Sequence, residues 1–219
     1  MYRAAYGVFQ NVHWHGKIAI VTGSGNNGGD GFALACILSR HGYTCSIFTL
    51  GKRLTEDGLF YAQQASDMGV RITPFDSGCV LSDYDIVVDC LLGTGFRGSV
   101  REDYRAAIRL LNDSGAFIVS VDINSGLNGD TGEADIAVMS DLTVAIGYIK
   151  NGLIASKARK YMKRLVCADI GIILIRKENL ICTTEEWIAL CESHGIKASA
   201  SQVTHDGRTY YRCPDWLEL

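Results

Sequence analysis

The stretch IAIVTGSGNNGGDGFALA, residues 18–35, decides how the chain is expected to fold. It begins as an apolar, β-branched run that predicts a buried strand, and it continues into a helical pattern. Gly23, Gly25 and Gly28 have the spacing G-x-G-x-x-G, which is typical of a dinucleotide-binding turn. Asn26, Asn27 and the Gly-Asp-Gly sequence after them are not explained by that motif. The stretch therefore predicts a strand, a turn and a helix, with a ligand site at the turn.

Further strand and helix patterns follow along the chain. Apolar runs that predict strands cover residues 44–50, 85–93, 116–122, 142–147 and 164–171. Helical patterns lie between several of them, including one that Thr55 can cap. Near-continuous apolar strands separated by helices indicate a parallel sheet covered on both faces. We expect an α/β fold over residues 1–172, with a doubly wound, Rossmann-like and mostly parallel sheet. Residues 173–219 are expected to form a C-terminal extension of unknown role.

Composition excludes several classes of protein. The chain has 219 residues, a net charge of −3 and a hydrophobic fraction of 47%. This charge gives no electrostatic surface for nucleic acid or for anionic lipid. No apolar run approaches the roughly 20 residues that span a bilayer, and the N-terminus lacks the apolar region of a signal peptide. We therefore expect a cytoplasmic protein that binds neither nucleic acid nor membrane.

Unusual polar residues and glycines fall where the predicted strands end. Asp89 lies in one strand and precedes a second glycine-rich loop, residues 93–99. Asp122 ends the next strand and is followed by Asn124 and Ser125. In α/β sheets, ligands bind outside the carboxyl ends of the strands. Asp30 is predicted in the first turn of the helix, where a carboxylate competes with a pyrophosphate for the same amides. The sequence thus predicts one site built from three loops.

Four segments together resemble the NAD(P)H-hydrate epimerases: GSGNNGGDGFALA, VVDCLLGTGFRG, VSVDINSG and KNGLIASKAR. Their order and rough spacing match over residues 17–172. The resemblance implies an isomerase of nicotinamide nucleotide repair, which interconverts the R and S hydrates of NADH and NADPH. It also implies that a separate ATP- or ADP-dependent dehydratase removes the S form, and that the protein can form a homodimer.

The resemblance also implies which residues form the site. A potassium ion would be bound by Asn27, Asp89 and Ser125, whose oxygens suit a hard cation. The hydrate, which is a substrate and not a cofactor, would contact a larger set. These residues are Asn26, Asn27, Gly28, Gly29, Asp30, Gly93, Thr94, Gly95, Phe96, Arg97, Gly98, Ser99 and Asp122.

The chemistry of the hydrate suggests an acid/base mechanism. Protonation of the C6 hydroxyl lets the ring nitrogen expel water, and water that adds back to the other face of the planar iminium gives the other epimer. Asp122 is the candidate for proton transfer, and Lys52 is the candidate for a nearby cation. Lys150 is a further candidate for the lining of the site.

Two features depart from the family pattern. The usual D-I-P-S-G is D-I-N-S-G over residues 122–126, so Asn124 replaces a proline of fixed φ and we expect a looser turn. The segment before the first strand, residues 1–16, is shorter than the helical segment of the family, and no dehydratase domain is expected. The chain is therefore interpreted as an N-terminally shortened member, and the shortening bears on stability and dimerisation.

Two other functions stay open on the sequence alone. Lys52 and Arg53 follow the second strand, where they could hold a 2′-phosphate, so an NADP-dependent oxidoreductase is one alternative. A non-catalytic scaffold for a ligand or a protein on the same fold is the other. Asp89, Asp122 and Ser125 argue against the scaffold, because a scaffold does not need them.

Overall fold

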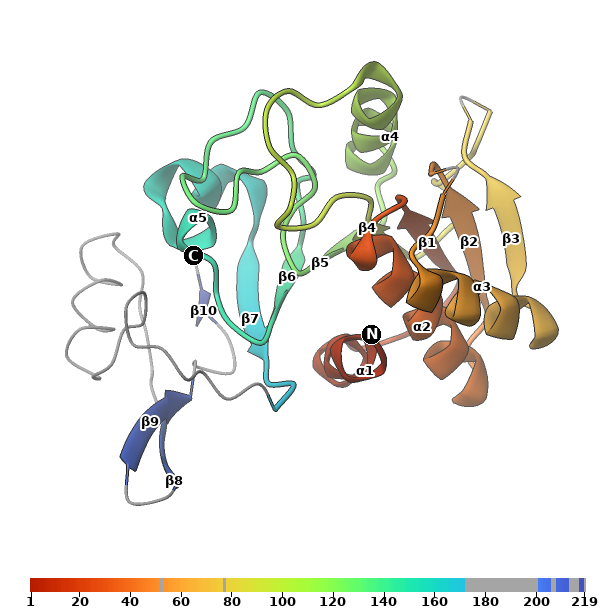
Figure 1. Ribbon diagram of the computed structural model, residues 1–219. Helices are drawn as coiled ribbons and strands as arrows, with labels where there is room; N and C mark the ends of the chain where they lie inside the picture. The colour runs from red at the N-terminus through yellow and green to blue at the C-terminus, as the bar shows by residue number, and fades with distance from the viewer. Residues whose placement is uncertain (52, 77, 172–200, 206–207, 213–216, 219) are drawn as a thin grey trace.

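One large sheet organises the chain in the computed structural model, which describes residues 1–51, 53–76, 78–171, 201–205, 208–212 and 217–218 (Figure 1). Seven strands run parallel in the order β7-β6-β5-β4-β1-β2-β3, and the short strand β10 adds antiparallel to β7. The strands of this sheet are β1 (Ile18–Thr22), β2 (Cys45–Thr49), β3 (Arg71–Pro74), β4 (Ile86–Cys90), β5 (Phe117–Val121), β6 (Leu142–Ile146), β7 (Arg164–Ala168) and β10 (Leu217–Glu218). β8 (Ser201–His205) and β9 (Arg208–Arg212) form a separate antiparallel pair.

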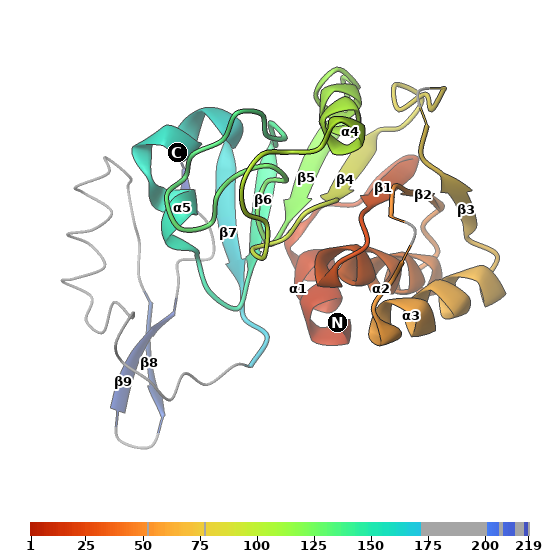
Figure 2. The same ribbon diagram turned by 45° about the horizontal axis from the view of Figure 1, so that its top comes forward.

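Helices cover both faces of the sheet, as Figures 1 and 2 show from two directions. On one face lie α1 (Tyr2–Asn11), α2 (Asn26–Arg40) and α3 (Glu56–Asp67). On the other face lie α4 (Glu102–Asn112), α5 (Asn151–Ile154) and the 3₁₀ helix η1 (Ser156–Tyr161). This arrangement confirms the predicted doubly wound α/β fold. Within the described residues, no helix has the length and apolar character needed to cross a membrane.

The side chains of each strand point alternately to the two faces of the sheet, so the hydrophobic core has a part on each face. In β1, Ile18 and Ile20 pack with the helices α1 to α3, whereas Ala19 and Val21 pack with α4. Since successive side chains of a strand point to opposite faces, both faces must be covered to bury such a strand. The fully apolar run that predicted β1 therefore also predicted a layer of helices on each side.

Several elements differ from the expectation. No apolar run predicts the edge strand β3, because three of its four residues are exposed. Residues 1–16 were given no element, but α1 forms there and buries Ala5 and Val8 against the core. α2 begins at Asn26, so the stretch from Asn26 to Gly31 is helix and not loop. Asp30 lies in the second turn of this helix, and its placement in the first turn was wrong.

The glycines of the G-x-G-x-x-G spacing have unequal roles. A Cβ atom on Gly23 would lie 2.0 Å from the Leu91 carbonyl oxygen, and one on Gly28 would lie 2.0 Å from the Gly23 carbonyl oxygen. A Cβ atom on Gly25 would meet nothing within 4 Å. The first and third glycines are therefore required by the close approach of β1, β4 and α2. This packing requirement explains the spacing without any ligand.

We expect Gly28→Ala to destabilise the protein much more than Gly25→Ala. The new methyl group at residue 28 must displace backbone, and overpacking of this kind costs about 1–3 kcal/mol or more. In a chain of this size that loss lowers Tm by roughly 2–4 °C for each kcal/mol. Gly25→Ala is the matched control, because Gly25 has φ −88° and open space around it. Thermal unfolding of both variants tests the assignment, and equal losses of Tm would contradict it.

Candidate functional site

The candidate site lies at the carboxyl ends of β1, β4 and β5. The strand order reverses at β1, because β2 lies on one side of it and β4 on the other. Such a switch point leaves a crevice beyond the strand ends, where α/β proteins bind ligands. Three chain segments meet there: the start of α2, the residues after β4 and the turn after β5. The predicted convergence of three loops on one edge of the sheet is thus present in the fold.

Asp89 is the most deeply buried charged group of this edge. Its side chain has no exposure to solvent. One carboxylate oxygen accepts hydrogen bonds from the Ser125 backbone N–H and from Ser120 Oγ, both at 2.9 Å. The other oxygen accepts from the Leu91 N–H at 3.2 Å and from Ser125 Oγ. Burial raises the pKa of the Asp89 carboxyl, and hydrogen bonds from Ser125, Leu91 and Ser120 oppose that rise.

Asn27 meets the same group of residues from α2. Its Nδ2 donates to the Leu92 carbonyl oxygen at 2.8 Å, and the Leu92 N–H donates to Ser125 Oγ at 2.8 Å. The Oδ1 of Asn27 is buried and has no hydrogen-bond partner among the described residues. A buried acceptor without a partner costs free energy unless a donor or a cation fills the space beside it. The structure thus brings Asn27, Asp89 and Ser125 together and leaves one acceptor unsatisfied.

Asp122 occupies an unusual backbone conformation at the end of β5. Its φ is +68°, and within the described residues it is the only non-glycine residue with positive φ. Its backbone N–H donates to the Val144 carbonyl oxygen at 2.8 Å, and its carboxylate forms an ion pair with Lys150. Both side chains are mostly buried. Strained residues of this kind gather at functional sites, because the surrounding structure must hold them in place.

Lys150 is the cation that the structure places beside Asp122. Its ammonium group also donates to the Ile146 carbonyl oxygen at 2.9 Å, so it is fixed at the end of β6. Lys52, to which the sequence assigns the cationic role, lies outside the described residues. Lys150 was predicted only as part of the lining, which understated its contact. The available signal was its position after β6, the strand next to β5.

Asp30 is a second acidic group close to Asp122. It projects from α2, and its side chain is mostly buried. Burial raises the pKa of Asp30 from 3.8 to about 7; the Met1 amino group 4.0 Å away lowers it, and the charge of Asp122 raises it further. A carboxyl group with such a pKa is partly protonated near neutral pH. Asp30 can therefore donate as well as accept a proton, which the sequence analysis did not foresee.

The second glycine-rich loop, residues 93–99, is held by its own arginine. The Arg97 guanidinium donates to the carbonyl oxygens of Thr94 and Phe96 at 2.7 and 2.8 Å. It also pairs with Asp130 at 2.9 Å, and both of these side chains are exposed. Arg97 therefore connects this loop to the loop that follows Ser125. Gly93 and Gly95 belong to the same loop, and Gly93 lies against Asn27.

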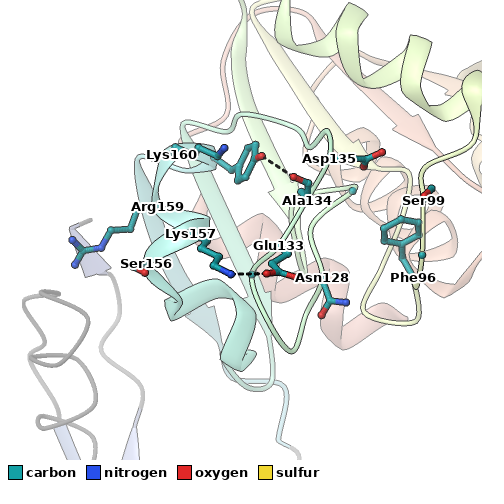
Figure 3. A pocket seen from close by; sticks show the side chains of 14 residues that line it. Phe96, Ser99, Asn128, Glu133, Ala134, Asp135, Ser156, Lys157, Arg159 and Lys160 are labelled. Carbon is teal, nitrogen blue, oxygen red and sulfur yellow. Dashed lines mark hydrogen bonds and ion pairs between the residues drawn. The ribbon is translucent and has the colours of Figure 1, made fainter.

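A cavity of about 820 Å³ opens beside this loop (Figure 3). Phe96, Gly98 and Ser99 form one wall, and the 3₁₀ helix η1 forms the opposite wall. Between them lies the loop from Gly126 to Asp135, where Glu133 forms an ion pair with Lys157. The residues of the first wall are among those that the sequence predicts for the site, whereas nothing in residues 156–161 by itself indicates a ligand.

Asn124 holds the turn after Asp122 firmly. Its side chain is fully buried, its Oδ1 accepts from Thr143 Oγ1 at 2.7 Å, and the two hydrogens of its Nδ2 are shared among three oxygens at 2.8–3.0 Å. The expectation that asparagine loosens this turn was therefore wrong. The physical reason is that the side chain supplies through hydrogen bonds the restraint that a proline supplies through its ring.

Comparisons with known proteins confirm the predicted family. The family model described as YjeF-related protein N-terminus matches residues 1–152. The bifunctional NAD(P)H-hydrate repair enzyme of Archaeoglobus fulgidus is 41% identical over 176 residues, which cover 78% of this chain and 36% of that protein. The NAD(P)H-hydrate epimerase of Limosilactobacillus fermentum is 35% identical over 154 residues, which cover 70% of this chain and 74% of that protein. The chain spans about a third of the length of the bifunctional relatives that it matches.

A solved structure supports the fold independently. The crystal structure of the yeast protein ynu0 matches with a TM-score of 0.67 and 19% sequence identity. The match covers 96% of this chain and 88% of that chain. At this identity the likeness bears on the fold alone, and it agrees with the doubly wound architecture.

Asp30→Asn is expected to stabilise the protein, and more at pH 8 than at pH 5. In the folded protein the pKa of Asp30 is raised from 3.8 to about 7, so folding takes up a proton between these two pH values. The free energy of unfolding therefore falls as the pH rises from about 4 to about 7. Asparagine cannot ionise, so the variant avoids a loss of up to roughly 4 kcal/mol above pH 7. Thermal unfolding of parent and variant at both pH values measures the difference.

Asp113→Asn is the matched control, because Asp113 is exposed at the end of α4. We expect its effect on Tm to be the same at both pH values. An equal gain from Asp30→Asn at pH 5 and pH 8 would show that Asp30 does not have the raised pKa.

Proposed function

The chain belongs to the family of YjeF-related protein N-terminal domains, and we propose that it is an NAD(P)H-hydrate epimerase. The observation that carries the proposal is the pair of neighbouring carboxyl groups at the sheet edge, Asp122 in a strained backbone and Asp30 with a pKa near 7. The names of two relatives, a repair enzyme and an epimerase, indicate the substrate class. The substrates are the R and S hydrates of NADH and NADPH.

The reaction requires a proton to be delivered to one hydroxyl group and then returned. Protonation of the C6 hydroxyl converts it into a leaving water, and the lone pair of the ring nitrogen forms a C=N bond as the C–O bond breaks. The planar iminium that results is then attacked by water from the opposite face. Loss of a proton from the added water gives the other epimer, so the overall reaction consumes nothing. Acid/base groups beside C6 that give and take one proton serve both directions.

Asp122 and Asp30 divide this work. Asp122 transfers the proton at C6, and Lys150 holds its carboxylate in place and limits its movement. Asp30 is partly protonated at neutral pH, so it can protonate the C6 hydroxyl, and that proton leaves with the expelled water. Asp122 takes a different proton from the water that adds, and transfer of one proton from Asp122 to Asp30 restores both groups. The negative charge of the Asp122 carboxylate also faces the positive charge that develops on the nicotinamide ring. Electrostatic stabilisation of that charge favours the iminium over the hydrate.

The remainder of the dinucleotide needs room and hydrogen-bond donors near the reacting ring. The loop from Gly93 to Ser99 offers backbone N–H groups and the Thr94 and Ser99 hydroxyls beside the start of α2. The cavity between Phe96 and η1 continues from this loop. We assign these parts to the ribose, phosphate and adenine groups of the hydrate. Asn26 begins α2 at this edge, whereas Gly28 packs against the Gly23 backbone and Gly29 packs against Met1 and Gly58.

A potassium ion fits the cluster of Asn27, Asp89 and Ser125. The buried and unpartnered Oδ1 of Asn27 and the fully buried Asp89 carboxylate supply oxygens that suit a hard cation. A bound cation would balance the buried charge of Asp89 and fix the three segments that carry the site. The catalytic groups themselves are Asp122 and Asp30, which reach the substrate directly.

Potassium is expected to stabilise the protein. Replacing tetramethylammonium chloride by potassium chloride at equal ionic strength should raise Tm, because an ion at about 100 times its Kd adds about 2.7 kcal/mol. This corresponds to roughly 5–10 °C in a chain of this size. Asn27→Ala should abolish the response, whereas Asn11→Ala on α1 should keep it. A potassium response that survives in Asn27→Ala would place the ion elsewhere.

The epimerase reaction also defines which reaction must follow it. Epimerisation alone repairs nothing, because both hydrates are inactive forms of the nucleotide. A dehydratase that acts on one epimer must remove its product. The bifunctional repair enzymes among the relatives are consistent with this coupling. We propose that an ATP- or ADP-dependent dehydratase accepts the S hydrate from this protein.

The direct test is the conversion of pure R-NADHX. The protein should accelerate formation of the S form above the spontaneous rate, as followed by chromatographic separation of the epimers. Asp122→Asn should lower this rate by about 10²–10⁴-fold, because loss of a general acid/base group has that effect. Asparagine tolerates the left-handed backbone at this position, so the fold is preserved. Asp113→Asn, at the exposed end of α4, is the control and should keep the parent rate.

Two results would contradict the proposal. A folded parent protein that does not accelerate epimerisation would remove the function itself. An Asp122→Asn variant within threefold of the parent rate would remove the assignment of Asp122 and leave the function intact.

A further inference from the structure

The side chain of Asn124 takes part in a closed group of buried hydrogen bonds. Thr143 Oγ1 donates to Asn124 Oδ1 at 2.7 Å, and Asn124 Nδ2 donates to Ser140 Oγ at 3.0 Å. Ser140 Oγ and Thr143 Oγ1 are themselves 2.8 Å apart. All three side chains are buried. The three residues therefore form a ring, which we call the Asn124 ring.

The direction of every bond in the ring follows from the chemistry of the groups. Asn124 Oδ1 carries no hydrogen, so the single hydroxyl hydrogen of Thr143 must point to it. The hydroxyl of Ser140 must then donate to Thr143, and Ser140 can accept from Asn124 Nδ2. Each hydroxyl thus donates once and accepts once. A closed ring with one direction is expected to be cooperative, because each bond polarises the next.

Two backbone carbonyl groups fix the asparagine further. Asn124 Nδ2 also lies 3.0 Å from the Val138 oxygen and 2.8 Å from the Tyr161 oxygen, so its two hydrogens are shared among three acceptors, Ser140 Oγ included. Rotation of the amide by 180° would place Oδ1 against these oxygens and Nδ2 against the Thr143 donor. Only one orientation therefore satisfies the buried groups. The side chain connects the turn after β5 to the residues before β6 and to the end of η1.

We propose that the Asn124 ring is a positioning device for the site, holding Asp122 and Ser125 at their working places. Asn124 lies between them in sequence, two residues after Asp122 and directly before Ser125. The strained backbone of Asp122 persists only if its surroundings over-determine it, and the ring supplies such a restraint on its C-terminal side. The part of this inference that concerns the rate of epimerisation rests on the proposed function. Asn124 is fully buried, so it acts through its neighbours.

Thr143→Val tests the ring with the smallest change in shape. Valine is close in shape to threonine but has no hydroxyl, so Asn124 Oδ1 loses its donor and Ser140 loses its acceptor. Thr143→Ser restores the hydroxyl and is the rescue variant. Thr22→Val is the matched control, because Thr22 is also 0% exposed and lies in β1, but its hydroxyl has no hydrogen-bond partner. Ser140→Ala is a second way to open the ring if Thr143→Val does not fold.

Two measurements are made on the parent protein and on each variant. The first is amide hydrogen exchange over residues 121–127, which reports how firmly the turn is held, whatever the protein catalyses. The second is the steady-state rate of epimerisation, separated into kcat and KM. A merely structural threonine would lower Tm and speed exchange along the whole chain alike, without changing kcat. A positioning ring must also change exchange in this turn and kcat.

For Thr143→Val we expect exchange in residues 121–127 at least about tenfold faster, because opening of the turn becomes easier. We expect kcat to fall about 10–100-fold, since small misplacements of catalytic groups have effects of this size, with KM within about threefold. Thr143→Ser should return both values to within about threefold of the parent, because it restores the hydroxyl. Thr22→Val should leave both unchanged.

The proposal and the function on which it rests fail in different ways. If Thr143→Val, or Ser140→Ala in its place, exchanges and turns over like the parent, the ring does not position the turn. If Thr143→Ser behaves like Thr143→Val, the shape of the side chain matters and the hydrogen bonds do not, which also overturns the proposal. If the parent does not epimerise, the proposed function is lost, while the exchange experiment still decides whether the ring holds the turn.

Discussion

The burial of one carboxylate, that of Asp89, determines how the rest of the site is arranged. A charge without access to solvent is costly unless several donors surround it. Asp89 obtains them from β5 and the turn behind it, through Ser120 and Ser125. Ser125 in turn accepts from Leu92, and the Leu92 carbonyl accepts from Asn27. The need to solvate one buried charge thus connects β4, β5 and α2 at the edge of the sheet.

Much of this edge could be predicted from the sequence, because parallel strands end on the same side of their sheet. Asp89, Asp122 and Ser125 each follow or end an apolar run, which is sufficient to bring them to one edge. The partner of Asp122 could not be predicted in the same way. A lysine follows β2 and another follows β6 in the sequence. Only the strand order shows that β6 is next to β5, whereas β4 and β1 lie between β5 and β2. That order depends on long-range packing, which no local pattern contains.

Asn124 and Asp30 show two further limits of sequence reasoning. An asparagine in a turn, considered without its surroundings, implies a backbone that is free to move. The side chain of Asn124 is instead held by hydrogen bonds to residues 14 to 37 positions further along the chain. The placement of Asp30 was wrong by about one helical turn, because α2 begins immediately at the asparagines. Its raised pKa depends on burial and on the nearby charge of Asp122, neither of which the G-x-G-x-x-G spacing reveals. Local motifs indicated where the site lies but not the protonation state of its groups.

The charges of the site have a consequence for the proposed reaction. Asp30, Asp89 and Asp122 lie at one edge, and Lys150 is the cationic side chain that pairs with one of them. Even the buried Cys90 thiol reflects this excess, because the charges of Asp89 and Asp30 raise its pKa in addition to burial. Burial is the main cause of the raised pKa that keeps Asp30 partly protonated, and the negative environment adds to it through the charge of Asp122. The same environment favours a cation, whether a bound metal ion or the iminium of the transition state. The charge of Asp122 therefore contributes both to the protonation of the donor, Asp30, and to the stabilisation of the charge that this donor creates.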